Sequence, residues 1–179
     1  MREPRLIVEA ATKATAVAML IGAIGICAHA QRPERQQELV VPGLGVHLRA
    51  GWRLLLRDPC RYAVPAAWQP APDHAQAFAP DGSSLSLWAL HVPNWASHTS
   101  RLKAVFGPAS RVREENDARL WIELTSRDRM EEYIAVTDGV TACAVLLEIR
   151  PSTPNPSDTI AAIAESLGFV SPGWTPDAK

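Results

Sequence analysis

The segment from residue 140 to residue 149 is apolar on both of its alternating faces. One set of side chains is Ala142, Ala144 and Leu146, and the other is Cys143, Val145 and Leu147. Because successive side chains of a strand point to opposite sides, a strand of this composition is covered on both faces of its sheet. The preceding Asp138-Gly139 pair is typical of a tight hairpin turn. The chain is therefore predicted to build a sheet that has helices or loops packed on each side.

Period-two alternation of apolar side chains predicts the other strands. It runs through residues 52–57, 60–64, 84–92, 111–114, 119–125 and 130–137, and a shorter strand is expected at 76–79. Asp58-Pro59 and Asp81-Gly82 are turn signals between strands, and Pro65 ends the strand before it. Strands joined by such short turns pair antiparallel, so an antiparallel sheet is expected.

Two helices are predicted from capping residues and apolar stripes. The first begins after Asn94, a favoured N-cap residue, and ends at Gly107-Pro108. Its stripe consists of Trp95, Leu102, Val105 and Phe106. The second has Asn155 at the cap and Pro156 at the first helical position, and its stripe of Ile160, Ile163, Ala164 and Leu167 is closed by Gly168. The predicted fold class is α+β, a mainly antiparallel sheet flanked by two helices.

The first thirty residues have the three parts of an export signal peptide. A weakly positive stretch, residues 1–13, precedes an uninterrupted apolar run of 15 residues, 14–28. Ala28-His29-Ala30 then places small side chains at positions −3 and −1 of a cleavage site. We expect cleavage after Ala30 and a periplasmic or secreted protein. The apolar run is shorter than the about 20 residues of a spanning helix, and no later segment is long enough, so no membrane span is expected after cleavage.

Two other interpretations of this leader stay open. The apolar run could remain as an uncleaved N-terminal anchor. Cys27 could be a lipidated cysteine, although Ile26 occupies the position at which a lipoprotein motif has a small residue. After the leader we expect a flexible lead-in at 31–44, a single domain at 45–170 and a loose tail at 171–179.

The charge balance after export excludes some classes of partner. Removing the leader takes away three of the 18 basic and two of the 19 acidic residues, which leaves a net charge of −2. Nucleic-acid binding requires a basic face, and binding to anionic lipid requires a polybasic segment. We therefore expect no nucleic-acid partner. An envelope or secreted protein is the expected partner class.

Two cysteines remain after cleavage, Cys60 and Cys143. In an oxidising compartment an even pair is most simply a disulfide, and closing this loop would stabilise the fold by about 4–5 kcal/mol in the chain-entropy model. Two unpaired buried thiols are the alternative. Neither cysteine lies in a CxxC motif, which argues against thiol redox catalysis and against a thiolate zinc site. No cofactor is predicted.

The order of elements resembles the PsbP/Mog1-like superfamily of α/β/α sandwiches over most of residues 45–170. The resemblance rests on YAVPAAW at residues 62–68, the two Asp-Gly turns, Arg119-Leu120-Trp121 and Glu165-Ser166-Leu167. It implies a largely non-catalytic role, because members of that superfamily are accessory subunits, nuclear-transport cofactors and exported bacterial proteins. It implies no site residue, since no functional motif of the superfamily occurs in this chain.

Histidine and serine give only weak indications of catalysis. Four histidines follow the leader, none at a short metal-ligand spacing: His47, His74, His91 and His98. His91 and His98 flank a strand-to-helix turn and are the candidates for a metal site or an acid–base pair. Solvated or singly hydrogen-bonded rings are the alternative. Ser83-Ser84 lacks the context of a nucleophilic serine, and the pairs Glu114-Glu115 and Glu131-Glu132 point to opposite faces and are expected to be solvated.

Tryptophan accounts for six of the eleven aromatic residues. Trp52, Trp88 and Trp121 lie in predicted strands and are expected in the core. The candidates for a binding surface are Trp68, Trp95 and Trp174, which lie in loops or at a helix start, where rigid rings can anchor a partner.

These observations favour an exported, non-enzymatic binding or accessory module that takes a protein partner or a small apolar ligand. No residue is assigned a catalytic role, because no short motif specifies a reaction. The alternative is a hydrolase or metal-binding protein that uses His91 and His98.

Overall fold

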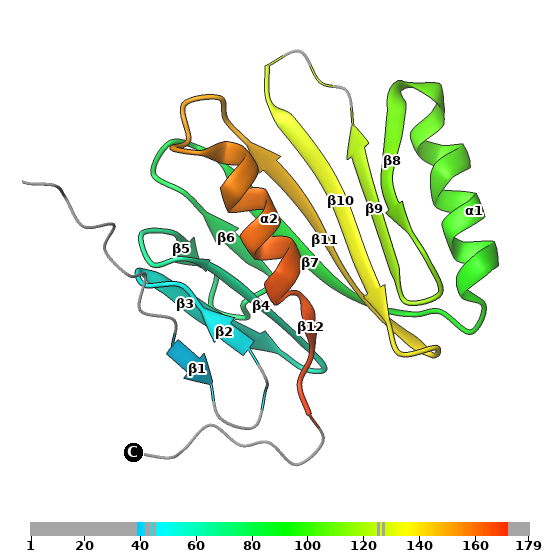
Figure 1. Ribbon diagram of the computed structural model, residues 1–179, viewed down its shortest axis with the longest axis horizontal. Coiled ribbons are helices and arrows are strands. Elements are labelled where there is room, and N and C mark those ends of the chain that lie inside the picture. Colours follow the sequence, from blue (N-terminus) through cyan, green and yellow to red (C-terminus); the bar gives the residue numbers. More distant parts are fainter. Residues whose placement is uncertain (1–38, 42–43, 45, 125, 127, 172–179) are drawn as a thin grey trace, which may run out of the picture. The chain divides into compact units, whose positions relative to one another are not determined.

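The computed structural model describes residues 39–41, 44, 46–124, 126 and 128–171, all within one unit of mutually contacting residues, 36–179 (Figure 1). The predicted leader, its cleavage site after Ala30 and the candidate Trp174 lie outside the described residues. Neither of the described helices has the length and hydropathy that a bilayer crossing requires.

The order of elements is that of an α+β fold with two helices, as predicted. In the described part of the chain the strands are β1 (Leu39–Val41), β2 (Val46–Leu48), β3 (Trp52–Arg57), β4 (Cys60–Pro65), β5 (Gln69–Pro70), β6 (Gln76–Phe78), β7 (Ser84–His91), β8 (Ser110–Glu115), β9 (Arg119–Leu124), β10 (Met130–Thr137), β11 (Thr141–Ile149) and β12 (Gly168–Phe169). The helices are α1 (Trp95–Phe106), with the 3₁₀ turn η1 (Gly107–Ala109) after it, and α2 (Pro156–Ser166).

The described strands form three antiparallel sheets. The largest has seven strands in the order β5-β6-β7-β11-β10-β9-β8, a second has the order β12-β4-β3, and the third is the β1–β2 hairpin. The sequence predicts one sheet, but the early strands separate from it because β4 pairs with β3 on one side and β12 on the other. The predicted lead-in at 31–44 lies mostly outside the described residues, and within it Leu39–Val41 pairs with Val46–Leu48.

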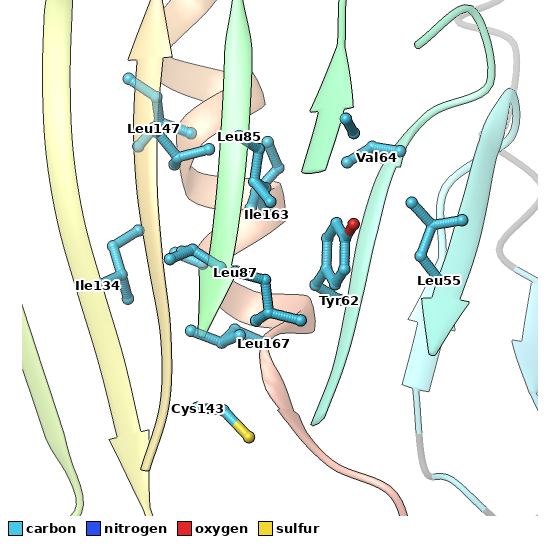
Figure 2. Close-up of a cluster of buried hydrophobic side chains, with 14 of the residues drawn as sticks. Leu55, Tyr62, Val64, Leu85, Leu87, Ile134, Cys143, Leu147, Ile163 and Leu167 are labelled. Carbon is cyan, nitrogen blue, oxygen red and sulfur yellow. The ribbon is translucent and has the colours of Figure 1, made fainter. Parts of the chain in front are cut away.

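Both faces of β11 are covered, which confirms the expectation for this strand. Cys143, Val145 and Leu147 point to the face on which α2 packs, and we call the cluster there the α2-side core. Figure 2 shows part of it, with Leu85 and Leu87 of β7 near Ile163 of α2 and Tyr62 of β4. On the opposite face Ala144 and Leu146 meet Trp95, Leu102 and Phe106 of α1 in what we call the α1-side core.

The β3–β4 hairpin is also covered on both sides. Tyr62 and Val64 of β4 belong to the α2-side core. Between them, Ala63 points the other way into a smaller cluster that includes Val46 and Leu48 of β2. The β1–β2 hairpin therefore closes the outer face of the smaller sheet.

Helix α1 begins and ends where the sequence predicts. The Asn94 side chain accepts a hydrogen bond from the Ser97 amide at 2.9 Å, and Gly107 at the C-cap has a φ of +68°. One residue of the predicted stripe is misplaced, because Val105 is 72% exposed. At about 100° per residue, Val105 lies about 80° around the helix from Trp95, which puts it at the solvent margin of the stripe.

The stripe of helix α2 is buried as predicted, but both of its ends differ from expectation. Asn155 stands at the N-cap with a left-handed φ of +47°, and its side chain makes no capping hydrogen bond. The C-cap is Leu167 in an extended conformation, so Gly168 does not supply a left-handed cap. A Cβ at Gly168 would lie 3.0 Å from Nη2 of Arg61, so the glycine makes room for the arginine.

The predicted disulfide between Cys60 and Cys143 is present. The sulfur atoms are 2.08 Å apart, the Cα atoms are 5.6 Å apart, and both residues are fully buried. The bond joins β4 of the three-stranded sheet to β11 of the seven-stranded sheet through the α2-side core. The two sheets are therefore linked covalently as well as by packing.

Candidate functional site

An apolar hollow of about 370 Å³ lies among the end of β4, the β6–β7 turn and the start of α2. Its apolar wall consists of Pro65, Ala67, Trp68, Ala79, Pro80 and Pro154. Asp81, Thr153 and Thr159 supply its few polar groups. We call this feature the Trp68 hollow, and its volume falls within the range of pockets that hold small molecules.

Trp68 reaches this position through a turn at the end of β4. Its amide donates a hydrogen bond to the Pro65 carbonyl at 2.9 Å, and the ring packs into the α2-side core. The side chain is only 3% exposed, so the expectation of a surface ring is wrong. The same residue lines the hollow, which makes it a fixed wall anchored in the core.

A hydrogen-bonded corner lies beside the hollow and joins two segments distant in sequence. The Thr153 hydroxyl donates to Oδ2 of Asp81 at 2.5 Å, while Oδ1 accepts from the Ser83 amide at 2.9 Å. Because Thr153 uses its proton on Asp81, the Ser83 hydroxyl 2.9 Å away must donate to Thr153, and it accepts from the Arg150 amide at 2.8 Å. The corner ties the β6–β7 turn to the loop before α2.

The hydrogen bonds of this corner favour the ionised form of the Asp81 carboxyl. Partial burial raises the pKa of Asp81, but the hydrogen bonds from Thr153 and Ser83 lower it by more, so the pKa lies below its ordinary value. Asp81 is the only ionisable side chain among the described residues that line the hollow. The geometry therefore offers an apolar wall with a carboxylate at its rim, and it lacks the second titratable group that an acid–base pair requires.

Sequence reasoning identified one wall of the hollow and missed the others. Pro80, Pro154 and Thr159 come from segments that only tertiary contacts bring to Trp68. The available signal was the density of prolines at 65–80 and 151–156, which marks rigid loops without showing that they meet.

The candidate Trp95 is not part of the same surface. It lies at the start of α1 in the α1-side core, on the face of the sheet opposite Trp68. Its indole N–H donates to the Asn116 carbonyl at 2.8 Å, and its ring stacks on His98 with the ring centres 5.8 Å apart. A single binding face built from Trp68 and Trp95 is therefore ruled out.

Among the tryptophans expected in the core, Trp88 is the exception. Trp52 and Trp121 pack partly buried against the α2-side core, but Trp88 is 41% exposed. Helix α1 covers the β8–β9 end of the sheet, where Lys103 pairs with Glu115 at 2.7 Å (Figure 1). Trp88 points to that same face from β7, opposite Ala144, and stays open to solvent there.

Glu132 is fully buried, although the sequence predicts that the adjacent acids Glu131 and Glu132 are both solvated. Its Oε2 accepts a hydrogen bond from the Trp121 indole N–H at 2.7 Å, and its Oε1 lies 3.1 Å from Nη2 of Arg113. The guanidinium carbons of Arg113 and Arg119 lie 5.5 and 5.6 Å from the centre of the Trp121 ring. Burial raises the pKa of Glu132, and the Trp121 hydrogen bond and the Arg113 charge offset only part of that effect.

His91 and His98 lie on different elements. His91 is exposed at the end of β7, opposite Thr141, whereas Nε2 of His98 is buried and has no hydrogen-bond partner among the described residues. Burial, with the charge of Arg101, lowers the pKa of His98. In the part of the chain that the structure describes, no three His, Cys, Asp or Glu side chains gather as metal ligands would. The metal or acid–base hypothesis for this pair stays a prediction.

Comparison with known proteins yields a loose structural likeness. No protein-family model matches the sequence, and no curated protein matches it. Among solved structures, the chain is similar to the solution structure of cyanobacterial PsbP (CyanoP) from Synechocystis sp. PCC 6803, with 12% sequence identity and a TM-score of 0.44. The match covers 72% of this chain and 96% of that chain. The loose resemblance to the PsbP-like fold agrees with the expectation from the sequence and says nothing about function.

Proposed function

We propose that this protein is an exported, non-catalytic binding module and that the Trp68 hollow takes an apolar group of its ligand or partner. The observation that carries the proposal is the hollow of about 370 Å³ with an apolar wall. Binding pockets are mostly apolar and have a few polar groups that fix orientation. Asp81 and Thr153 at the rim are suited to fixing the orientation of a bound group.

The rigidity of the hollow supports binding. Pro65, Pro80 and Pro154 each fix a backbone φ angle, and Trp68 is held by the core behind it. A ligand that enters a preformed site loses less affinity to the ordering of side chains and loops. The proposed site therefore needs no rearrangement of the fold.

The export part of the proposal rests on two independent features. One is the leader at residues 1–30, and the other is the Cys60–Cys143 disulfide, a type of bond that persists in oxidising compartments. The intact mass of the protein recovered outside the cytoplasm checks it. A mass that lacks residues 1–30 is expected. A mass that retains them would contradict cleavage and favour the tethered form.

Two neighbouring alanines allow a matched test of the hollow. Ala66 and Ala67 are both exposed, but only Ala67 lines the hollow. Ala67→Phe should fill part of it, and Ala66→Phe adds the same side chain outside it. Titration with the uncharged fluorescent probe N-phenyl-1-naphthylamine should give equal affinities for the wild type and Ala66→Phe, and an affinity about tenfold or more weaker for Ala67→Phe. Equal affinities for all three proteins would contradict the proposal.

The same variants test for a protein partner. Affinity capture from envelope extracts should recover a protein with the wild type and with Ala66→Phe that Ala67→Phe fails to recover. A partner captured equally by all three would bind elsewhere on the surface. In that case the probe titration alone would decide whether the hollow holds a small ligand.

A further inference from the structure

A second cavity, of about 220 Å³, lies between β2, β4 and the last turn of α2. It is on the outer side of β4, the side of Ala63, away from the α2-side core. Its walls include the apolar side chains of Leu48 and Trp52, together with His47, Arg49, Arg61 and Glu165. We call it the Arg49–Arg61 cavity. It shares no lining residue with the Trp68 hollow.

The charges of this cavity are unbalanced in favour of cations. Among the described residues that line it, two guanidinium groups face one carboxylate, that of Glu165. Nη2 of Arg49 is 3.7 Å from Oε2 of Glu165, and the two side chains are 34% and 71% exposed. A long ion pair at this exposure is weak, so the donors of Arg49 remain available to another anion.

Arg61 is the more buried of the two cations. Its Nε donates to the Phe169 carbonyl at 2.9 Å, and its Nη1 donates to the Ser166 carbonyl at 3.0 Å. Both acceptors are neutral, and partial burial lowers the pKa of Arg61. Among the described residues no carboxylate lies within ion-pair distance of this guanidinium. A guanidinium carries five N–H donors, so donors remain beyond the two used on the backbone.

The size and the wall of the cavity restrict the ligand. Its volume is below the roughly 300 Å³ at which pockets for drug-sized molecules begin, so the ligand must be small. The planar fork of an arginine matches the two oxygens of a carboxylate. Leu48 and Trp52 offer apolar contact to a short hydrocarbon chain.

We propose that the Arg49–Arg61 cavity binds a small monocarboxylate. The carboxylate group lies between Arg49 and Arg61, and the short apolar chain lies against Leu48 and Trp52. Glu165 at the rim competes with the ligand for Arg49. This site is separate from the proposed function of the Trp68 hollow, and neither depends on the other.

The test is a titration of the full chain with sodium propionate, followed by ¹H–¹⁵N NMR. Saturable shifts are expected for the Trp52 indole N–H and the amides of Leu48 and Ala63. Propionamide has the same shape without the charge and should leave these signals in place. Equal shifts with propionamide would overturn the proposal, because the arginines would then play no part in binding.

Three charge variants separate a binding role from a structural one. Arg49→Gln should weaken propionate binding by about tenfold or more, and Glu165→Gln should tighten it because the competing carboxylate is gone. Arg101→Gln removes the same charge from exposed α1, outside the cavity, and should bind as the wild type does. Arg61 is left unchanged, since its hydrogen bonds hold the end of α2.

The variants also give clear contrary outcomes. If Arg49→Gln and Arg101→Gln weaken binding equally, propionate responds only to net charge and the proposal fails. If inorganic phosphate shifts the same signals and propionate does not, the carboxylate class is wrong. If Glu165→Gln fails to tighten binding, the competition assigned to Glu165 is absent.

Discussion

The Glu132 carboxyl is buried away from water, and its partners are one indole N–H and one guanidinium group. An ionised carboxylate is costly to bury, and its hydrogen bond with Trp121 and its ion pair with Arg113 offset part of that cost. The partners depend on the acid in turn. Removing the side chain would leave the Trp121 N–H without its acceptor, which costs about 1–3 kcal/mol for a buried donor.

Replacing this acid should alter how stability depends on pH. Burial raises the folded-state pKa of Glu132 above its ordinary value of 4.5, so between these two pKa values the folded chain holds the proton more tightly than the unfolded chain. The stabilisation from this proton is fully present below the unfolded pKa and is lost as the pH rises through the folded pKa. Glu132→Gln keeps a hydrogen-bond acceptor for the Trp121 N–H. The variant has no carboxyl to titrate, so it does not lose this stabilisation as the pH rises.

Urea unfolding of the wild type and Glu132→Gln across this range measures the effect. The free energy of unfolding of the variant, relative to that of the wild type, should rise through the window above pH 4.5 and then level off. A difference that stays constant with pH would contradict the raised pKa. Groups common to both proteins cancel in the comparison.

The sequence predicts Trp68 at the surface and Trp88 in the core, and the structure reverses both. The two residues therefore give a paired prediction. Trp68→Ala should destabilise the fold by about 3–5 kcal/mol, because a 3% exposed ring leaves a cavity in the core. Trp88→Ala should cost less than half as much, since 41% of that side chain already faces solvent. Thermal unfolding of both variants checks the order. Equal losses would mean that β7 is covered where the structure leaves it open.

At the scale of elements, the two helices begin in different ways, although each has an asparagine before it. Asn94→Ala should destabilise α1 by about 1 kcal/mol, because the side chain satisfies the Ser97 amide. Asn155→Gly should be neutral or slightly stabilising, because that residue has a left-handed φ of +47° and no capping bond. Urea unfolding distinguishes them. A comparable loss for Asn155→Gly would show that its side chain has a role in the cap.

Most individual helices and strands could be predicted from the sequence, but which strands pair and which faces the helices cover could not. Alternation along β11 places Cys143 and Ala144 on opposite faces, and this follows from the pleat alone. The pairing of β4 with β12 depends on two residues far along the chain, and no local pattern marks them. Burial of a ring depends on which strands a helix covers, so Trp88 could not be told from a core residue by its position in a strand.

The candidate sites were less predictable than the fold, for the same reason. Trp68 could be selected as an unusual residue, but its hollow needs Pro80 and Pro154 from other loops. Arg61 has the sequence environment of an ordinary outward-facing strand residue. Only the folded chain shows that its guanidinium is held against the end of α2, by hydrogen bonds to the Ser166 and Phe169 carbonyls and beside Gly168.

At the scale of the whole molecule, the disulfide fixes two sheets to each other across the main core. Changing both Cys60 and Cys143 to alanine should lower the free energy of unfolding by about 4–5 kcal/mol in the chain-entropy model, for a sequence separation of 83 residues. Alanine is suited to the test because both positions are fully buried. Unfolding of the wild type under reducing conditions should show a similar loss. A loss below about 1 kcal/mol in both experiments would contradict the bond.

A pulling force applied to the two ends of the chain would pass directly through the Cys60–Cys143 bond. The chain between the two cysteines, which are 83 residues apart in sequence, would bear none of that force. At about 3.4 Å per residue, roughly 280 Å of chain would therefore not extend. Strands β5 to β10 and helix α1 lie inside this loop, whereas α2 and β12 lie outside it. Tension would therefore pull α2 and residues 144–149 of β11 away from the core, while the segment between the two cysteines carries no load. Only reduction of the bond would let that segment extend.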